Sequence, residues 1–349
     1  MSMAAAVCSS MSMAAILGLL LWLAPFAAAI PTVRLNNGVE MPIISAGTAG
    51  YNDSQAALAV RAALAGNVTA IHTAFDYFNL AGVAKGLEAR PRREIFLASM
   101  TSPCVHDSPP ARNVTDAGAC EALTTRELES LLASLNTTYP AASSDGVAFR
   151  AGKRVDIRPG RYLDLVMLHG PSEPFGYEGA CSEAVCKLNS AQWAAYEKFL
   201  RAGKARAVGV SNYCQSCLEC LSGTTPAVNQ LQYHVGSGAD PEALLSFNRA
   251  WGVNVQAYSP LASGAVVRDA DVAKIAAKVG KSAAQVALRY VLQNGAKPSV
   301  VVKASKPAYL AEDLDVFDFE LSAADMATLD AKTTPAGQQD GRPSWGCAA

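Results

Sequence analysis

Leu163-Asp-Leu-Val-Met-Leu168 is a short apolar run of the kind that forms a buried strand, and a helical pattern follows it at residues 190–201. The same unit recurs along the chain. Strand-like runs lie at residues 43–46, 70–73, 95–99, 163–168, 207–211, 227–231, 254–257 and 299–303. Helical stretches lie at residues 54–65, 124–135, 190–201, 241–251 and 283–293, with Ser54, Thr124 and Ser190 as expected N-caps. Short strands that alternate with helices predict a parallel sheet with helical crossovers.

Eight such units favour a closed barrel over an open, doubly wound sheet. An open nucleotide-binding sheet usually carries G-x-G-x-x-G after its first strand, and Gly47-Thr-Ala-Gly50 lacks that spacing. Asn36-Asn37-Gly38 predicts a tight hairpin before the first barrel strand. We therefore predict an α/β fold, a (β/α)8 TIM barrel with an N-terminal β-hairpin. Residues 101–119 and 139–161 are expected to be aperiodic insertions.

The composition indicates a large buried core. Of 349 residues, 50% are hydrophobic and 17% are charged, and the mean hydropathy is +0.14, which excludes a disordered or fibrous chain. There are 29 Lys and Arg against 30 Asp and Glu, a formal charge of -1, so no basic surface is expected to bind nucleic acid or an anionic membrane. The one apolar run near spanning length lies at the start of the chain, which excludes a polytopic membrane protein.

Residues 1–29 are typical of a secretory signal peptide. An apolar region at residues 14–23 precedes Pro25 and the small residues Ala27-Ala28-Ala29, so cleavage is expected near Ala29 or Ile30. The expected location is the secretory pathway or the extracellular space, and a membrane anchor or an organelle lumen is the alternative. The predicted domain then spans residues 30–335, and residues 336–349 form a C-terminal tail.

Glycosylation sequons and cysteines agree with that compartment. The sequons are at Asn52, Asn67, Asn113 and Asn136. Nine cysteines minus Cys8 of the signal leave eight, an even number. Short spacings favour pairing Cys104 with Cys120, Cys181 with Cys186, and one pair among Cys214, Cys217 and Cys220. The alternatives are buried thiols, or a zinc site at the last three cysteines, which lack a fourth ligand at finger-like spacing.

Short sequence motifs near the ends of these strands resemble those of the aldo-keto reductase family, and the resemblance extends over residues 32–334. The matching stretches are Leu35-Asn-Asn-Gly-Val-Glu-Met-Pro42, Asp164-Leu-Val-Met-Leu-His169, Gly203-Lys-Ala-Arg-Ala-Val-Gly-Val-Ser-Asn212, Val228-Asn-Gln230, Gln256-Ala-Tyr-Ser-Pro-Leu261 and Val316-Phe-Asp-Phe-Glu-Leu-Ser322. The resemblance implies a barrel that holds NADPH, with NADH possible, across its C-terminal mouth. It also implies hydride transfer to a small-molecule aldehyde or ketone. We expect a monomer with no nucleic-acid partner, no membrane contact beyond targeting and no metal.

The resemblance assigns roles to four catalytic positions. Hydride arriving at a carbonyl carbon develops negative charge on the oxygen, which requires a hydrogen-bond donor or an acid. By matched position, Tyr77 is the acid and His169 polarises the carbonyl. The family's buried Asp–Lys pair, which lowers the pKa of the tyrosine, is replaced by His72 and Met100. Replacement of both members of the pair is reasonable, because one buried charge without its partner would strongly destabilise the fold.

Without that cation, the pKa of Tyr77 is expected to stay near the free value of about 10, which makes it a poorer acid. A protonated His72 would restore part of the positive field. Asp76, the neighbour of Tyr77, either pairs with His72 or points to solvent.

The cofactor positions match the family more closely. By resemblance, Ser211, Asn212 and Gln230 hydrogen-bond the nicotinamide carboxamide, and Tyr258 stacks under the ring. The resemblance places Ser259 and Leu261 along the pyrophosphate channel, Lys303 against the 2′-phosphate, and Ser305 and Glu312 in the same cofactor site.

Two departures at the adenine end leave the choice between NADPH and NADH open. The serine expected after Lys303 is Ala304, and the arginine expected six residues after that lysine is Tyr309, which can stack but carries no charge. Lys306 is the candidate replacement for the missing positive charge.

Two functions of different classes fit these observations. One is an active secreted or lumenal reductase with an altered acid–base apparatus. The other is a catalytically inactive nucleotide-binding pseudoenzyme that acts as a secreted binding module. A barrel metallohydrolase using His72 and His169 is disfavoured, because the chain has 4 His and no His-x-His at a strand end. Residues 101–119 and 170–189 are the loops expected to contact the substrate. They match no recognisable motif, so the sequence does not identify the substrate.

Overall fold

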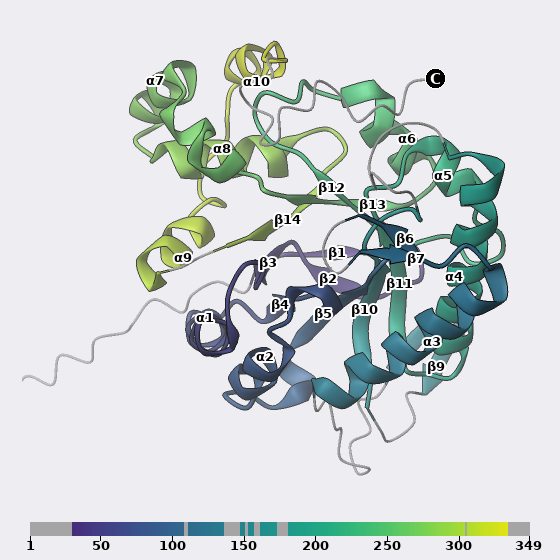
Figure 1. The fold of residues 1–349 in the computed structure, drawn as a ribbon. Coiled ribbons are helices and arrows are strands. Elements are labelled where there is room, and N and C mark those ends of the chain that lie inside the picture. The colour runs from purple at the N-terminus through teal and green to yellow at the C-terminus, as the bar shows by residue number, and fades with distance from the viewer. Residues whose placement is uncertain are drawn as a thin grey trace, which may run out of the picture.

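Eight parallel strands close into a barrel in the order β10-β11-β12-β13-β14-β3-β4-β5 (Figure 1). This computed structural model describes residues 30–107, 111–135, 147–150, 153–156, 161–172, 181–303 and 306–333. The barrel strands are β3 (Ile44–Gly47), β4 (Ala70–His72), β5 (Phe96–Thr101), β10 (Leu163–Leu168), β11 (Ala205–Ser211), β12 (Val228–Gln232), β13 (Asn254–Tyr258) and β14 (Ser299–Val302). The predicted (β/α)8 barrel is therefore confirmed, and each expected strand lies within two residues of its predicted bounds.

Helices lie outside the strands in Figure 1. They are α1 (Asp53–Ala65), α2 (Leu80–Leu87), α3 (Ala117–Ser134), α4 (Glu183–Arg201), α5 (Gln215–Glu219), α6 (Leu244–Ala250), α7 (Ala270–Val279), α8 (Ala283–Gln293), α9 (Pro307–Leu314) and α10 (Ala323–Asp330). Short 3-10 turns are η1 (Phe75–Tyr77), η2 (Arg92–Glu94), η3 (Pro241–Ala243), η4 (Ala262–Gly264) and η5 (Val266–Arg268). In the described part of the chain, no helix has both the length and the apolar character needed to cross a membrane.

The expected N-caps were wrong at all three helices. The helices begin at Asp53, Ala117 and Glu183, so Ser54, Thr124 and Ser190 lie inside them. The capping side chains belong to Asn52, Asp116 and Ser182, which accept hydrogen bonds from the backbone N–H groups of Gln55, Ala119 and Val185. Several polar residues near the start of each helix could have served as its N-cap. Which of them does so depends on how the preceding loop packs.

The core has two apolar layers that follow the alternation of side chains along each strand. Phe96, Met100, Leu165 and Met167 belong to the cluster inside the barrel. Their neighbours on the same strands, such as Leu97 and Val166, belong to the larger cluster between the strands and the helices. Both faces of every barrel strand are therefore covered, which explains why the strands read as nearly continuous apolar runs.

The N-terminal hairpin closes one end of the barrel. Strands β1 (Thr32–Arg34) and β2 (Glu40–Pro42) pair antiparallel across the turn at residues 35–39, as predicted. Asn36 and Asn37 donate side-chain hydrogen bonds of 2.9 Å to the carbonyls of Pro226 and Arg206. These bonds fix the hairpin to the N-terminal end of β11 and to the loop before β12, so the opposite end of the barrel is left for a ligand.

A buried ion cluster lies at the same closed end. The Asp164 side chain, 1% exposed, forms ion pairs of 2.7 Å with Arg92 and with Arg206 and accepts a hydrogen bond from the backbone of Leu97. Because the carboxylate is fully paired, this cluster joins β5, β10 and β11 without leaving a buried charge uncompensated.

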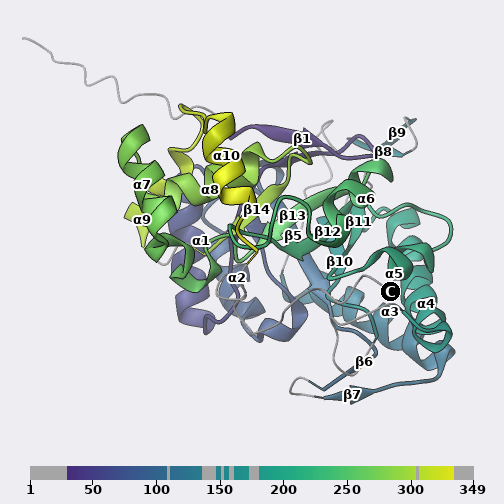
Figure 2. The ribbon, with the colours of Figure 1, turned by 90° about the horizontal axis from the view of Figure 1, so that it is seen from above.

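The two insertions lie on opposite sides of the molecule. In Figure 2, the hairpin of β6 (Val105–His106) and β7 (Arg112–Asn113) lies opposite β1, whereas β8 (Val147–Arg150) and β9 (Lys153–Asp156) lie on the side of β1. Both insertions form short hairpins where aperiodic chain was expected. Only the first of them, which follows β5, is placed to border a site at the C-terminal ends of the strands.

Several predictions fall outside the described residues and stay predictions. These are the signal peptide at residues 1–29, the tail at residues 336–349, Ser305 and the sequon at Asn136. The sequon asparagines Asn52, Asn67 and Asn113 are exposed.

Candidate active site

The C-terminal ends of the barrel strands surround a cavity of about 630 Å³. This volume is within the range typical of small-molecule sites, about 300–1,000 Å³. It is lined by Gly47, Ala49, His72, Tyr77, His169, Ser211, Asn212, Gln230, Tyr258, Ser259, Pro260, Leu261, Ser263, Gly264, Val301, Val302, Lys303, Tyr309 and Asp313. Residues far apart in sequence meet here because parallel strands end at the same edge of a barrel.

Most of the predicted site residues that the structure describes line this one cavity, and Met100 and Glu312 do not. Met100 is 0% exposed and packs inside the barrel, below the cavity. Glu312 is half-buried on α9 and is not among the lining residues, although its neighbour Asp313 is. Met100 therefore contributes packing to the barrel interior, and the position the resemblance gave to a lysine presents no polar group.

His169 and Asp76 are hydrogen-bonded to each other at the cavity. His169 directly follows β10, and its backbone N–H donates to the carbonyl of Thr101 at 3.0 Å. Its Nδ1 lies 2.9 Å from Oδ1 and 2.8 Å from Oδ2 of Asp76, on η1. Burial by itself would raise the pKa of Asp76, but the hydrogen bond and charge of His169 outweigh it and hold that pKa below its usual value. With Nδ1 occupied, Nε2 is the ring nitrogen left to address a ligand in the cavity.

His72 is neutral, which corrects the expectation that it supplies a positive charge. The Gln230 amide nitrogen lies 3.0 Å from His72 Nε2 and 2.7 Å from Oε1 of Gln256, so it donates to both and the imidazole nitrogen is an acceptor. Full burial and the charge of His169 lower the pKa of His72 to about 3. The sequence left open whether Asp76 pairs with His72 or points to solvent, and its carboxylate instead contacts His169.

Tyr77 lies beside His169 at the same wall of the cavity. The two rings meet edge to face, with centroids 5.6 Å apart and planes at 73°. Tyr77 belongs to η1, the turn that also carries Asp76, so one short segment positions both the phenol and the partner of the imidazole. The phenol and the imidazole can therefore approach the same ligand atom.

A hydrogen-bonded network forms the middle of the cavity. Tyr258 donates its hydroxyl to Asn212 Oδ1 at 3.0 Å, and Asn212 Nδ2 donates to the His169 carbonyl at 2.9 Å and to Ser211 Oγ at 3.0 Å. Ser211 in turn donates to the carbonyl of Gln230 at 2.8 Å. Asn212 adopts a left-handed backbone with φ of 61°, a conformation that asparagine tolerates better than most residues. The network fixes an aromatic ring and several amide and hydroxyl groups in one wall.

The loop after β13 continues the cavity. Ser259 and Ser263 line it with positive φ values of 50° and 48°, and Gly264 lines it at 84°. Consecutive backbone conformations of this kind are costly outside glycine and are found where a ligand contacts the main chain. This geometry is compatible with the pyrophosphate role that the resemblance assigns to Ser259 and Leu261.

The far end of the cavity is less basic than the resemblance implies. Lys303 directly follows β14, and its ammonium group lies 4.5 Å from the centroid of the Tyr51 ring. Tyr309 is 47% exposed, and the ammonium group of Lys306 lies 5.1 Å from its ring centroid. Two lysines and a stacking ring are therefore present, with no guanidinium among the lining residues of the described chain.

Asp313 adds an acidic group at this end. Its residue is 5% exposed on α9, and burial followed by the charge of Glu312 raises the pKa of Asp313 to about 7. Near neutral pH the side chain is therefore only partly ionised, and its negative charge grows as the pH rises.

We expect Asp313→Asn to stabilise the protein at pH 8 and to leave it unchanged at pH 4. The folded state holds the Asp313 proton up to pH about 7, whereas an unfolded aspartate ionises near pH 3.9. The contribution of Asp313 to the free energy of unfolding of the wild type is therefore fully present below pH 4 and is lost as the pH rises to 7. Thermal unfolding should show a gain of at least about 1 kcal/mol for the variant at pH 8. Glu320→Gln is the control, because that side chain is 83% exposed. An equal gain at both pH values would contradict this explanation.

These groups fit a nicotinamide dinucleotide in kind. The network offers amide and hydroxyl groups to a carboxamide and a tyrosine ring to a nicotinamide, and Lys303 offers a charge to a phosphate. The fit is weaker at the adenine end, where Tyr309 stands for an arginine and Asp313 adds negative charge as the pH rises.

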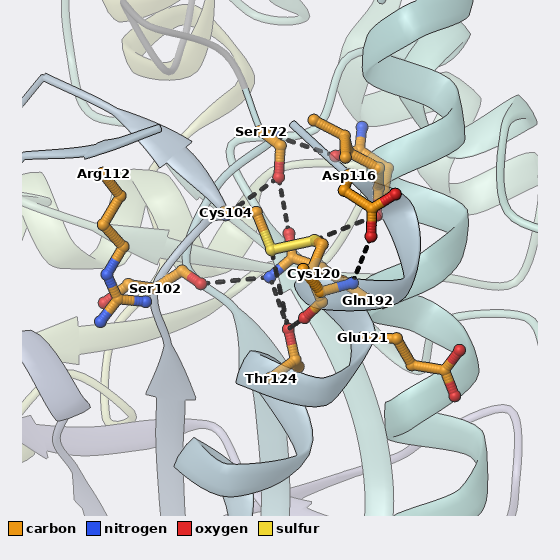
Figure 3. The surroundings of a disulfide bond; sticks show 12 residues. Ser102, Cys104, Arg112, Asp116, Cys120, Glu121, Thr124, Ser172 and Gln192 are labelled. Carbon is orange, nitrogen blue, oxygen red and sulfur yellow. Dashed lines mark hydrogen bonds between the residues drawn. A yellow bond between two sulfur atoms is a disulfide. The ribbon is translucent and has the colours of Figure 1, made fainter. Parts of the chain in front are cut away.

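Disulfides hold the loops around the mouth, and Figure 3 shows the first of them. Cys104 and Cys120 are bonded, as predicted, with Cα atoms 5.7 Å apart. Beside them, Gln192 of α4 donates to the carbonyl of Ser102 and to Thr124 Oγ1, each at 3.1 Å. The bridge and the glutamine together tie the loop after β5 to α3 and α4.

The other predicted disulfide pairings were wrong. Cys181 pairs with Cys217, and Cys186 pairs with Cys220. Cys217 and Cys220 are three residues apart, which places both on one face of the short helical segment at α5, against the start of α4. Cys214 is disulfide-bonded as well, so these three cysteines are not available as zinc thiolates. Short sequence spacing failed as a guide because two packed helices bring distant cysteines together.

Sequence reasoning missed two groups that matter here. Asp76 was noted beside Tyr77, but its partner could not be identified, because the contact with His169 spans 93 residues. Asp313 was overlooked, although the resemblance placed its neighbour Glu312 in the cofactor site, and it is Asp313 that lines the cavity.

Comparisons with known proteins find similarity in both sequence and fold. A model of the Aldo/keto reductase family matches residues 154–334. Morphine 6-dehydrogenase of Pseudomonas putida is 31% identical, covering 87% of this chain and 92% of that protein. Glyoxal reductase of Bacillus subtilis is 31% identical, covering 86% of this chain and 92% of that protein. The crystal structure of an aldo/keto reductase from Brucella melitensis matches with a TM-score of 0.67 at 27% identity, covering 86% of this chain and 97% of that one.

Proposed function

The chain belongs to the aldo/keto reductase family, and on that basis we propose that it reduces an aldehyde or ketone by hydride transfer from NADPH or NADH. Membership of the family supports an oxidoreductase that acts on a small-molecule carbonyl compound. The dinucleotide, the roles of the individual residues and turnover itself belong to the proposal.

The observation that carries the proposal is that two groups of side chains lie next to each other in one cavity. Tyr77 and His169 lie on one side, and Ser211, Asn212 and Tyr258 form the network beside them. A donor pair for a carbonyl oxygen thus lies next to groups suited to a nicotinamide.

The chain's residues have distinct tasks in this reaction. A nicotinamide dinucleotide held by these residues would supply a hydride to the carbonyl carbon. The Tyr77 hydroxyl gives its proton to the carbonyl oxygen, and His169 Nε2 donates a hydrogen bond to the same oxygen. The two groups together stabilise the negative charge that develops on that oxygen. Asn212 fixes the rim of this site, because its amide links the His169 carbonyl to the Tyr258 hydroxyl.

The alternative is a nucleotide-binding pseudoenzyme. It is favoured by one finding, that His72 is neutral and Met100 is apolar where the family has a buried Asp–Lys pair. Both functions share the cofactor groups and differ only in whether Tyr77 can transfer its proton.

Two measurements on the purified chain separate these functions. Quenching of intrinsic fluorescence is titrated with NADPH and, separately, NADH, since Trp and Tyr are available as reporters. Loss of nicotinamide absorbance is then followed with an aromatic aldehyde. We expect saturable binding and measurable turnover. Binding without turnover would leave the pseudoenzyme, and no binding of either dinucleotide would overturn both.

A further inference from the structure

We infer that the ion pair between His169 and Asp76 supplies the positive charge beside Tyr77 that the family obtains from its buried lysine. Asp76 is then a positioning residue: it orients His169 and faces its Nδ1 with a carboxylate, and it acts on the carbonyl only through the imidazole. This inference rests on the proposed function and names how its acid–base site operates without the Asp–Lys pair.

The geometry of the pair suits this task. Both carboxylate oxygens of Asp76 lie within 2.9 Å of His169 Nδ1. The side chains are 19% and 26% exposed, so the pair is partly shielded from water and its attraction is stronger than that of a surface ion pair. The Tyr77 ring meets the imidazole edge to face at 5.6 Å between centroids. A charge on His169 therefore acts at short range on the phenol.

Two imidazoles border the cavity, and the structure assigns the charge to one of them. His72 accepts a hydrogen bond at Nε2 from Gln230, which a protonated Nε2 could not do. His169 faces a carboxylate instead. Because two adjacent imidazolium groups repel each other, the carboxylate decides which one keeps its second proton. This explains how the site can lack a lysine and still contain a cation.

Other ionisable groups around the pair come from the loop after β5 and from α3. His106 on β6 acts on Asp76 through its charge and favours the ionised carboxylate. Glu127 on α3 acts on it with the opposite sign, but it is held in an ion pair with Arg112 on β7. Tyr77 on η1 and His72 on β4 face the imidazole itself. None of these neighbours is a carboxylate in contact with His169, so Asp76 is its counter-ion among the described residues.

The reaction balances with this assignment. A C–H bond of the reduced dinucleotide would break and its hydride would form a C–H bond at the carbonyl carbon, so the dinucleotide would be oxidised and the carbonyl π electrons would move to oxygen. The Tyr77 O–H bond breaks as its proton forms the new alcohol O–H bond. The imidazolium of His169 keeps its proton and stabilises the resulting phenolate, which takes a proton from solvent before the next turnover. The sum is one carbonyl, one reduced dinucleotide and one proton giving one alcohol and one oxidised dinucleotide.

The test is Asp76→Asn, which keeps the size and the acceptor oxygen but removes the charge. We expect kcat/KM of the variant to be about tenfold below wild type at pH 8 and within about threefold at pH 5.5, because the variant lacks the opposite charge that favours a cation within hydrogen-bond distance. A purely structural defect would lower kcat/KM by the same factor at both pH values. Asp76→Glu, which restores the charge, should recover part of the loss at pH 8.

A second readout does not depend on turnover. The chain has 4 His, so the imidazole nitrogen signals can be assigned by single substitutions and followed by NMR across pH. The midpoint of the His169 signal should fall in Asp76→Asn and stay in place in Asp318→Asn, the control, whose carboxylate pairs with Lys281 away from the cavity.

The outcomes are separable. An unchanged His169 midpoint in Asp76→Asn overturns the inference, and so does a shifted midpoint with a pH-independent loss of kcat/KM. A wild type without turnover defeats the proposed function, whereas the midpoint still decides whether Asp76 holds the proton of His169.

Discussion

Tyr77→Phe is expected to lower kcat by at least about 100-fold, in line with the loss of a positioned general acid. The substitution removes the one hydroxyl that can give a proton to the carbonyl oxygen beside His169, while the ring and its edge-to-face contact remain. Single-turnover absorbance measurements with an aldehyde check the rate, and fluorescence titration checks the dinucleotide affinity, which should change less than about twofold.

The comparison with Tyr309→Phe provides the control. Tyr309 also lines the cavity, but it lies at the far end and is 47% exposed, so loss of its hydroxyl should leave kcat unchanged. If Tyr77→Phe kept most of its rate, His169 rather than the phenol would be the proton donor.

Met100→Lys is expected to destabilise the protein by about 3–5 kcal/mol, because a lysine there is a buried charge without a partner. Met100 is 0% exposed among Phe96, Leu165 and Met167 inside the barrel. Adding His72→Asp should recover most of the loss. His72 pairs in register with Ala98 on β5, and Met100 is the next inward-facing position of that strand, within reach of a lysine side chain.

The double variant should also raise kcat, because a lysine ammonium beside Tyr77 would lower the pKa of the phenol. Chemical denaturation and initial rates across pH test both effects. Met100→Leu is the matched control, because a volume-conserving substitution in a core costs less than about 1.5 kcal/mol. A folded double variant with an unchanged rate would show that this site does not work through a cation beside Tyr77.

The strands could be predicted from sequence because their signal is local. A strand buried on both faces must be apolar along its length, and each run at residues 70–73, 163–168 or 254–257 carries that requirement in its own residues. The helix starts were less well predicted. Thr124 and Ser190 are capping residue types, but Asp116 and Ser182 cap the helices, because the choice depends on where the preceding loop packs.

The site residues also divide into those whose place the sequence predicted and those whose place it did not. The sequence predicted that His169, Ser211 and Tyr258 lie around one cavity, because motifs at the ends of parallel strands meet at the same mouth of the barrel. Tyr77 lines the same cavity from η1, the turn that follows β4. The partner of His169 could not be assigned. Asp76 had a choice between His72, solvent and a residue 93 positions away, and only the packing of η1 against β10 selects the last.

The amino-acid order alone determined the barrel, its N-terminal hairpin and the side of the barrel on which the chemistry must lie, since periodicity and strand-end residues are properties of neighbours in the chain. The tertiary structure decided which ionisable groups touch. It made His72 neutral, gave Asp76 to His169, joined Cys181 to Cys217 and turned Asp313 toward the cavity. Charge state and pairing depend on burial and on distances of a few ångströms between segments remote in sequence, and these exist only once the helices have packed around the barrel.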